Sequence, residues 1–229
     1  MFDRGSFAPL AAEAIGTYLF FVVGAGAVIV DVITGGGIGL LGVALAHGLT
    51  LAALATAFGA ISGGQFNPAV TIALWLTGKV RTVEGIRYVV AQLVGAALAG
   101  FTLKLAFVGV ETPSAYDLAT GGAPALGSGL DQLQGIVVEA ILTAVLVYAV
   151  LLTAADARAP RMGGLFIGLV VIADIVVGGP LTGAAMNPAR WFGPALAFGD
   201  LSQAPIYLVG PIVGATLAAL SVRYLFAER

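Results

Sequence analysis

Six long apolar runs constrain the fold of this chain more than any other feature. Each run falls within the range of about 17–25 residues that a helix needs to cross the roughly 30 Å hydrocarbon core of a bilayer. Inside lipid only helices and closed barrels satisfy their backbone polar groups, and uninterrupted runs of this length are typical of helices. The sequence therefore predicts an all-α membrane protein with six transmembrane helices, at residues 9–31, 38–58, 84–108, 131–154, 162–179 and 204–226.

The composition agrees with a protein that lies in lipid. Hydrophobic residues make up 59% of the chain and charged residues 10%, which is too few charges to cover the surface of a soluble domain. The 33 glycines favour close helix packing, because small residues let membrane helices approach one another. A formal net charge of −2 gives no reason to expect a nucleic acid partner.

The reactive side chains that enzymes and metal sites need are scarce. The chain has no cysteine and one histidine, which excludes disulfides, thiolate metal sites and cysteine nucleophiles. No serine nucleophile motif is recognisable. We therefore expect no catalytic residue, no metal site and no cofactor, and we do not expect an enzyme.

Two further apolar segments, at residues 67–77 and 188–198, are too short to span a bilayer. Each begins at an Asn-Pro pair. Asparagine is a strong N-cap, and proline suits the first helical position because the N–H that it lacks would be unpaired there. The segments are therefore predicted to be two re-entrant half-helices that enter the membrane from opposite sides.

The two halves of the chain repeat at an offset of about 120 residues. The only asparagines, Asn67 and Asn187, both stand before Pro-Ala at equivalent points of the repeat. Each half has three spans, so the second half must lie inverted relative to the first. We expect a single transmembrane channel domain at 1–229, with repeat one at about 9–108 and repeat two at about 131–226.

Two half-helix starts that meet at the middle of the membrane would create a distinctive environment. Their positive dipole ends disfavour cations, whereas the asparagine amides can donate hydrogen bonds to water. This arrangement therefore predicts that the molecule passing through the lumen is uncharged. The residues of the paired motif are Asn67, Pro68, Ala69, Asn187, Pro188 and Ala189.

The basic residues indicate the orientation of the chain. If the spans alternate, nearly all of them fall on one face, which should be cytoplasmic. Both termini are then cytoplasmic, and the short tails and low lysine content favour a prokaryotic cell (inner) membrane. The residues on that face are Arg4, Lys79, Arg81, Arg87, Arg158, Arg161, Arg223 and Arg229.

Residues 62–70, Ser-Gly-Gly-Gln-Phe-Asn-Pro-Ala-Val, and 182–190, Thr-Gly-Ala-Ala-Met-Asn-Pro-Ala-Arg, resemble the two signature loops of the aquaporin, or major intrinsic protein, family. The resemblance covers nearly the whole chain. It implies a right-handed bundle with its own pore, a homotetramer in membrane lipid, and passage of water. It also implies that Glu13 and Glu139 brace the two loops through hydrogen bonds.

A second constriction is expected on the outer side of the motif. Arg190 lies three residues after Asn187, about one helical turn, so its guanidinium should line the outer lumen. The family pattern adds His47, Ile175 and Ala184 to this selectivity filter. The set resembles that of the plant tonoplast intrinsic proteins, some of which pass ammonia, urea or hydrogen peroxide besides water.

Two other transport functions remain open from the sequence. Glycerol facilitators usually carry Asp and a basic residue where this chain has Trp191 and Ala195, although Trp191 also departs from the water-channel pattern. An ion-coupled transporter would also use inverted repeats, but it needs a group that binds the coupling ion. Asp174 is unexplained: we expect it either to anchor Arg190 or His47, or to cap a loop amide.

Overall fold

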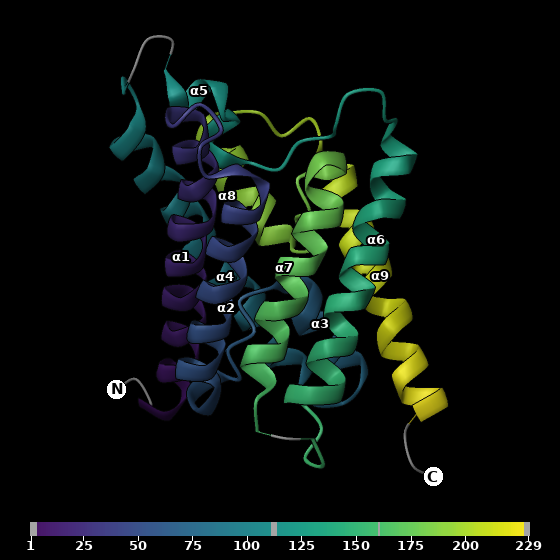
Figure 1. Ribbon diagram of the computed structural model, residues 1–229. Helices are drawn as coiled ribbons and strands as arrows, with labels where there is room; N and C mark the ends of the chain where they lie inside the picture. The colour runs from purple at the N-terminus through teal and green to yellow at the C-terminus, as the bar shows by residue number, and fades with distance from the viewer. Residues whose placement is uncertain (1–3, 111–113, 160, 227–229) are drawn as a thin grey trace.

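The computed structural model describes residues 4–110, 114–159 and 161–226, and its regular structure there is helical. Six long helices cross the molecule side by side (Figure 1). They confirm the predicted spans, with ends that differ from the apolar runs by a few residues. Their bounds are α1 (Arg4–Ile33), α2 (Gly39–Ser62), α4 (Thr82–Phe107), α6 (Gln132–Ala149) with its π-helical extension η2 (Val150–Ala154), α7 (Gly163–Thr182), and α9 (Ala204–Ser221) with its extension η3 (Val222–Phe226).

Two half-helices, α3 (Pro68–Leu76) and α8 (Pro188–Phe198), complete the bundle. In Figure 1, α3 lies in the lower half of the molecule and α8 in the upper half, so they approach its centre from opposite faces. Each begins as the sequence predicts, with an asparagine whose side-chain oxygen accepts from the backbone N–H groups of the first turn. The half-helices are thereby confirmed.

Glycines allow the long helices to touch through their backbones. A Cβ atom on Gly48 of α2 would collide with the carbonyl oxygen of Gly168 in α7, and the reverse holds for Gly168. Two further helix pairs, α1 with α4 and α6 with α9, touch in the same way. A Cβ atom on Gly95 of α4 would collide with the Ala14 carbonyl of α1, and one on Gly214 of α9 would collide with the Ala140 carbonyl of α6. These contacts fix the helix spacing that small residues permit in lipid.

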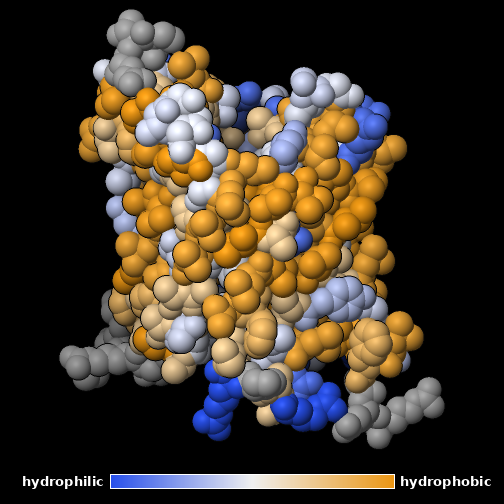
Figure 2. Space-filling view, viewed as in Figure 1, coloured by the Kyte–Doolittle hydropathy of each residue, from blue (hydrophilic) through white to orange (hydrophobic). Residues whose placement is uncertain are grey.

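The outer surface is a broad apolar belt with polar residues gathered at both ends (Figure 2). Many large apolar side chains of the spans are exposed, among them Leu105 at 83% and Leu133 at 68%. In water such a surface would be an aggregation liability, so it identifies the lipid-facing perimeter.

The start of α1 and the end of η3 lie at the same end of the bundle as the loops at 77–81 and 155–162 (Figure 1). The two loops carry Lys79, Arg81, Arg158 and Arg161. The side chains of Arg4 and Arg229, which also belong to the predicted basic face, lie outside the described residues. At the opposite end, the connection from α4 to α6 contains α5 (Ala115–Leu118) and the short helix η1 (Thr120–Gly122).

Candidate functional site

The two asparagines of the repeated motif are tied to the opposite halves of the chain. Asn67 Nδ2 donates to the carbonyl oxygen of Met186 at 2.9 Å, and Asn187 Nδ2 donates to that of Phe66 at 2.9 Å. A side-chain amide has two N–H groups. One N–H of each asparagine is therefore left to face the cavity that both residues line.

The residue before each asparagine has an energetically unfavourable backbone conformation. Phe66 has φ 48° and Met186 has φ 52°, in the left-handed region that side chains other than glycine seldom adopt. Such strain persists only where the surroundings hold it. Here it directs the Phe66 and Met186 carbonyls at the asparagine of the other half.

Two fully buried glutamates supply the restraint. Glu13 accepts from the backbone N–H of Gln65 at 3.0 Å and of Phe66 at 2.8 Å. Glu139 accepts in the same way from the backbone N–H groups at 185 and 186, at 2.9 and 2.7 Å. Both carboxyl groups thus lie behind the strained turns and bond to their backbone.

Hydroxyl donors complete each of these clusters. Ser62 donates to Glu13 at 2.6 Å, and Thr182 donates to Glu139 at 2.6 Å. The first half has an additional donor, because Gln92 Nε2 of α4 bonds to Glu13 at 2.8 Å. Glu139 has no such amide partner among the described residues, so the two halves are braced unequally.

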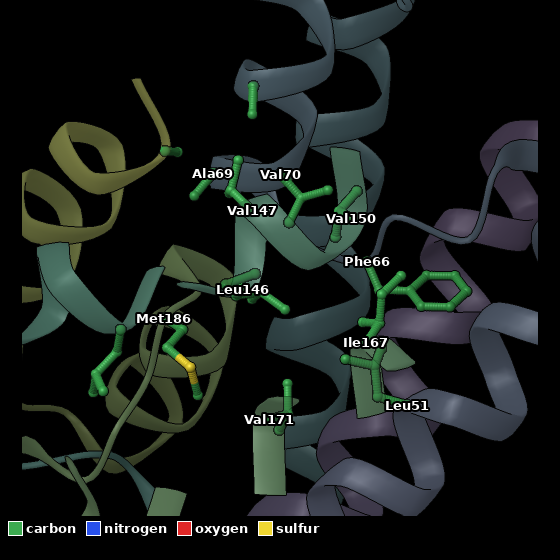
Figure 3. Close-up of a cluster of buried hydrophobic side chains, with 14 of the residues drawn as sticks. Leu51, Phe66, Ala69, Val70, Leu146, Val147, Val150, Ile167, Val171 and Met186 are labelled. Carbon is green, nitrogen blue, oxygen red and sulfur yellow. The ribbon is translucent and has the colours of Figure 1, made fainter. Parts of the chain in front are cut away.

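A narrow cavity passes the two asparagines. It offers about 50 Å³ to the centres of water molecules, so it is large enough to admit water. Most of its wall is apolar. Figure 3 shows the side chains that gather there from several helices, and those among them that line the cavity are Leu51, Val70, Leu146, Val150, Ile167, Val171 and Met186.

On the α8 side of the cavity, Arg190 and His47 meet. Arg190 Nε donates to His47 Nε2 at 2.9 Å, and the other imidazole nitrogen, Nδ1, lies 2.9 Å from the Val43 carbonyl. The carbonyl can only accept, so Nδ1 carries the proton and Nε2 is the acceptor, which assigns a neutral imidazole. Arg190 Nη1 donates to the Gly122 carbonyl at 2.7 Å. Both side chains are buried at 4% exposure.

The other two residues of the expected filter also line this part of the cavity. Ile175 is 4% exposed and Ala184 is 3% exposed. Ala184 has φ 46°, another left-handed position, at the place where the first half has Gly64 with φ 61°. The structure therefore places His47, Ile175, Ala184 and Arg190 on the wall of one cavity.

Three contributors to the filter were not found from the sequence. Phe20 lies edge-on to His47 with ring centroids 6.0 Å apart, and Gly24 leaves the space that the imidazole occupies. The Gly122 carbonyl is provided by the loop after α5. The Gly121-Gly122 pair was the one available signal, since adjacent glycines often mark close backbone approach.

Asp174 plays neither of the roles expected for it. It is 5% exposed, and its Oδ2 atom has no hydrogen-bond partner within the described part of the chain. Arg190 is held instead by His47 and the Gly122 carbonyl, so the expectation of an Asp174 anchor or loop cap is wrong. The Thr143 hydroxyl, on α6, is likewise buried and without a partner there.

Trp191 follows Arg190 but turns away from the cavity. Its ring stacks on Tyr207 of α9 with centroids 5.6 Å apart and an interplanar angle of 18°, and it is 3% exposed. The Tyr207 hydroxyl donates to the Thr182 carbonyl at 2.8 Å. The unusual tryptophan thus supports the back of the second motif loop.

The opposite mouth of the cavity is bordered by a loop tethered to the first half. Lys79 Nζ donates to the Ala155 carbonyl at 2.7 Å, directly after the cavity-lining Ala154. In the same loop, Arg158 pairs with Asp156 at 2.7 Å and holds the pKa of that half-buried carboxyl below its ordinary value. Within the described residues, no group of three His, Cys, Asp or Glu side chains is placed to hold a metal ion.

Comparison with known proteins agrees with this geometry. The family model "Major intrinsic protein" matches residues 5–222. Aquaporin TIP4-4 of Zea mays is 43% identical over 98% of this chain and 88% of its own length, and the probable aquaporin TIP3-2 of Arabidopsis thaliana is 46% identical over 82% and 68%. The solved aquaglyceroporin of Plasmodium falciparum superposes with a TM-score of 0.85 over 97% of both chains, at 22% identity, which shows a shared fold. The chain is a member of the major intrinsic protein family, the aquaporins.

Proposed function

We infer that this protein is a passive transmembrane water channel. The observation that carries the inference is the pair of cross-tied asparagines, each with one N–H left for a small cavity of about 50 Å³. A water oxygen can accept from these donors as it passes. The remaining wall is mostly apolar and holds water weakly, which favours rapid movement.

Ions are excluded by the same arrangement. The N-termini of α3 and α8 meet at the cavity and present the positive ends of their dipoles. In aquaporins generally, selectivity is attributed to pore diameter, lining donors and an arginine barrier. A cation would lose its hydration shell in an apolar channel and meet Arg190 besides.

We propose that His47, Ile175, Ala184 and Arg190 form the selectivity filter. Of the five guanidinium N–H groups of Arg190, two are used by His47 and the Gly122 carbonyl, and three remain for a substrate oxygen. Ile175 and Ala184 provide an apolar side to the filter. Small neutral solutes such as ammonia, urea and hydrogen peroxide are therefore proposed to pass besides water.

Glu13 and Glu139 are proposed to brace the two motif loops. Their hydrogen bonds to the strained backbone at Phe66 and Met186 support this role. Such engagement also argues against use of either glutamate as the binding group of an ion-coupled transporter, because four donors already bond to Glu13 and three to Glu139.

The assembly and location are also proposals. We propose a homotetramer in lipid, with one pore per protomer and both termini cytoplasmic, as the basic residues of the loops at 77–81 and 155–162 favour. We propose the cell (inner) membrane as its location. Fractionation of the native cells distinguishes this from a vacuolar membrane, which the TIP names of the plant relatives favour.

Stopped-flow light scattering on proteoliposomes tests the proposed function. An impermeant osmolyte should cause rapid shrinkage, and urea or ammonia gradients should give re-entry, while glycerol entry stays low. An Ile175→Trp variant, which fills the filter, is the matched control and should conduct no better than empty liposomes. Rapid glycerol entry would establish a glycerol facilitator instead, and loss of flux with a protonophore would establish ion coupling.

A further inference from the structure

A groove on the outside of the bundle has no part in the pore. It lies between α3 and α4 and offers about 330 Å³. Its two hydroxyl groups are already engaged, since Thr71 donates to Gln65 at 2.7 Å and Thr82 accepts from Trp75 Nε1 at 3.0 Å. The groove is otherwise apolar, and the residues that line it are Thr71, Ile72, Trp75, Thr82, Gly85, Ile86, Val89 and Val90.

The inverted repeat shows that this groove is not required by the fold. At the offset of 120 residues, Trp191 of α8 occupies the position of Thr71 in α3. Trp191 is 3% exposed and its ring is stacked on Tyr207, so large side chains fill much of the corresponding region of the second half, where the hollow beside Trp191 and Ala195 offers only about 40 Å³. The first half keeps the larger space, and the lipid-exposed Trp75, at 44% exposure, stands at its edge.

The groove begins at the end of the bundle where the basic loops lie. Its α4 wall runs from Thr82 to Val90, about 12 Å along the helix axis towards the middle of the membrane. This length is comparable to that of the part of one acyl chain that lies within a single leaflet. An apolar slot of this orientation, open to the hydrocarbon, suits an extended lipid tail.

Unpaired positive charge lies beside the entrance. Arg81 directly precedes the first groove residue of α4, and Arg87 lies within the second turn. Both are exposed, and neither makes a hydrogen bond or ion pair with the described residues. Lys79 and Arg223 differ, because each bonds to a backbone carbonyl. The half-buried Glu84 lies in the first turn of α4. Together, Arg81, Arg87 and Glu84 leave one net positive charge at the entrance.

We propose that this groove is a binding site for an anionic phospholipid of the cytoplasmic leaflet. One acyl chain occupies the slot between α3 and α4, the indole of Trp75 lies at the interface, and Arg81 and Arg87 hold the phosphate. Tryptophan favours the membrane interface, and basic residues attract anionic headgroups. The leaflet follows from the proposed orientation, whereas the site itself is independent of what the pore conducts.

Native mass spectrometry of the purified full-length protein tests the site, with phosphatidylglycerol as the probe and phosphatidylcholine of the same chains as its neutral counterpart. Phosphatidylglycerol should bind more tightly. Arg81→Gln and Arg87→Gln should each weaken its binding about fivefold, or about 1 kcal/mol per basic residue. Arg161→Gln, an exposed arginine in another loop of the same face, is the matched control and should leave binding unchanged.

Gly85→Leu tests the apolar slot. A Cβ on Gly85 meets only Thr71 Cγ2 and Val80 Cγ1, both at 3.6 Å, so the added side chain fills the groove without collision at its base. Binding of phosphatidylglycerol should fall at least as far as in the arginine variants. Ala106→Leu, an enlargement on the same helix at its other end, is the control. Ile86→Trp, at the lip of the groove where Ile86 is 62% exposed, gives a second blocked variant should Gly85→Leu fail to fold.

Several outcomes would overturn the site. Weakening by the arginine variants alone would mean general attraction to the surface without a seated chain. Weakening by Gly85→Leu alone, equal for both lipids, would mean a slot that does not select charge. Dissociation of the assembly by Gly85→Leu would make the groove a contact between copies, and equal binding by all variants would mean no site. Water permeability, unchanged in each variant, shows that the pore is intact.

Discussion

Arg190 and His47, which are 143 residues apart in the chain, share a hydrogen bond of 2.9 Å from Nε to Nε2. The Val43 carbonyl fixes the imidazole tautomer that allows it. The one histidine of the chain is therefore the acceptor that orients Arg190, the arginine of the proposed filter, and it lines the same cavity.

Replacement of His47 by alanine should widen the filter and release Arg190 Nε from its partner. We expect urea and glycerol permeability to rise severalfold with water permeability retained, measured by stopped-flow light scattering. Leu51→Ala is the control, because Leu51 lines the same cavity one helical turn away and has no bond to Arg190. Equal solute entry in the two variants would show that His47 does not limit passage.

Ala184→Gly should relieve strain and enlarge the filter together. Alanine at φ 46° costs about 1–2 kcal/mol, which exceeds the roughly 0.5–1 kcal/mol of extra chain entropy that glycine loses on folding. The thermal midpoint in detergent should stay the same or rise, and urea entry should increase. The neighbouring Ala185→Gly relieves no positive φ, so it should lower the midpoint; a fall of the same size in both variants would remove the strain argument.

Glu139→Gln should weaken the second motif loop. The carboxylate accepts from the Thr182 hydroxyl and from two backbone N–H groups, whereas a glutamine has one acceptor oxygen and would leave a buried donor unpaired. The expected cost is about 1–3 kcal/mol, seen as a lower thermal midpoint and reduced water permeability. Val137→Ala, at a lipid-exposed site of the same helix, should change neither; wild-type behaviour of Glu139→Gln would leave the bracing role without support.

Gly168→Val should separate α7 from α2. Its side chain would collide with the Gly48 carbonyl, which is backbone and cannot move aside alone. We expect little folded protein by size-exclusion chromatography. Gly59→Val, on α2 where nothing lies within 4 Å of an added Cβ, is the matched control and should fold. Normal assembly of both variants would mean that the α2–α7 contact tolerates more spacing than the structure suggests.

Mercurial reagents should not inhibit the native protein, because its sequence has no cysteine. Ala184→Cys places a thiol in the filter and should make water flow sensitive to mercury and recoverable with a thiol reductant. Leu217→Cys, at a lipid-facing position with 61% exposure, controls for modification outside the pore. Inhibition of the native protein at low reagent concentration would contradict the prediction.

The sequence predicted the helices well because their signals are local. The apolar runs set the six spans, and the Asn-Pro pairs at residues 67 and 187 marked the N-caps of α3 and α8, so the predicted half-helices lie within a residue of the observed ones. The end of a span is less certain, because polar residues such as Arg4 can continue a helix beyond its apolar part. Helix α1 therefore begins earlier than its apolar run.

The filter was only partly predictable. Side chains at fixed distances from the motif, such as Arg190, could be inferred from helical geometry and family resemblance. The Gly122 carbonyl could not, because a backbone acceptor leaves no trace in residue type and its loop has no periodic pattern. Asp174 shows the converse difficulty: its charge is visible in the sequence, but the surroundings that decide its role depend on tertiary packing.

The cross-tied asparagines also bear on how the protein is made. Asn67 bonds to a carbonyl 119 residues later in the chain, and Asn187 to one 121 residues earlier. During synthesis the first three spans enter the membrane well before Met186 exists, so in a half-finished chain Glu13 can already brace the first loop but the Asn67 amide has no Met186 carbonyl to bond. The pore centre can therefore close only in the last stage of biosynthesis, after the second motif loop has been made.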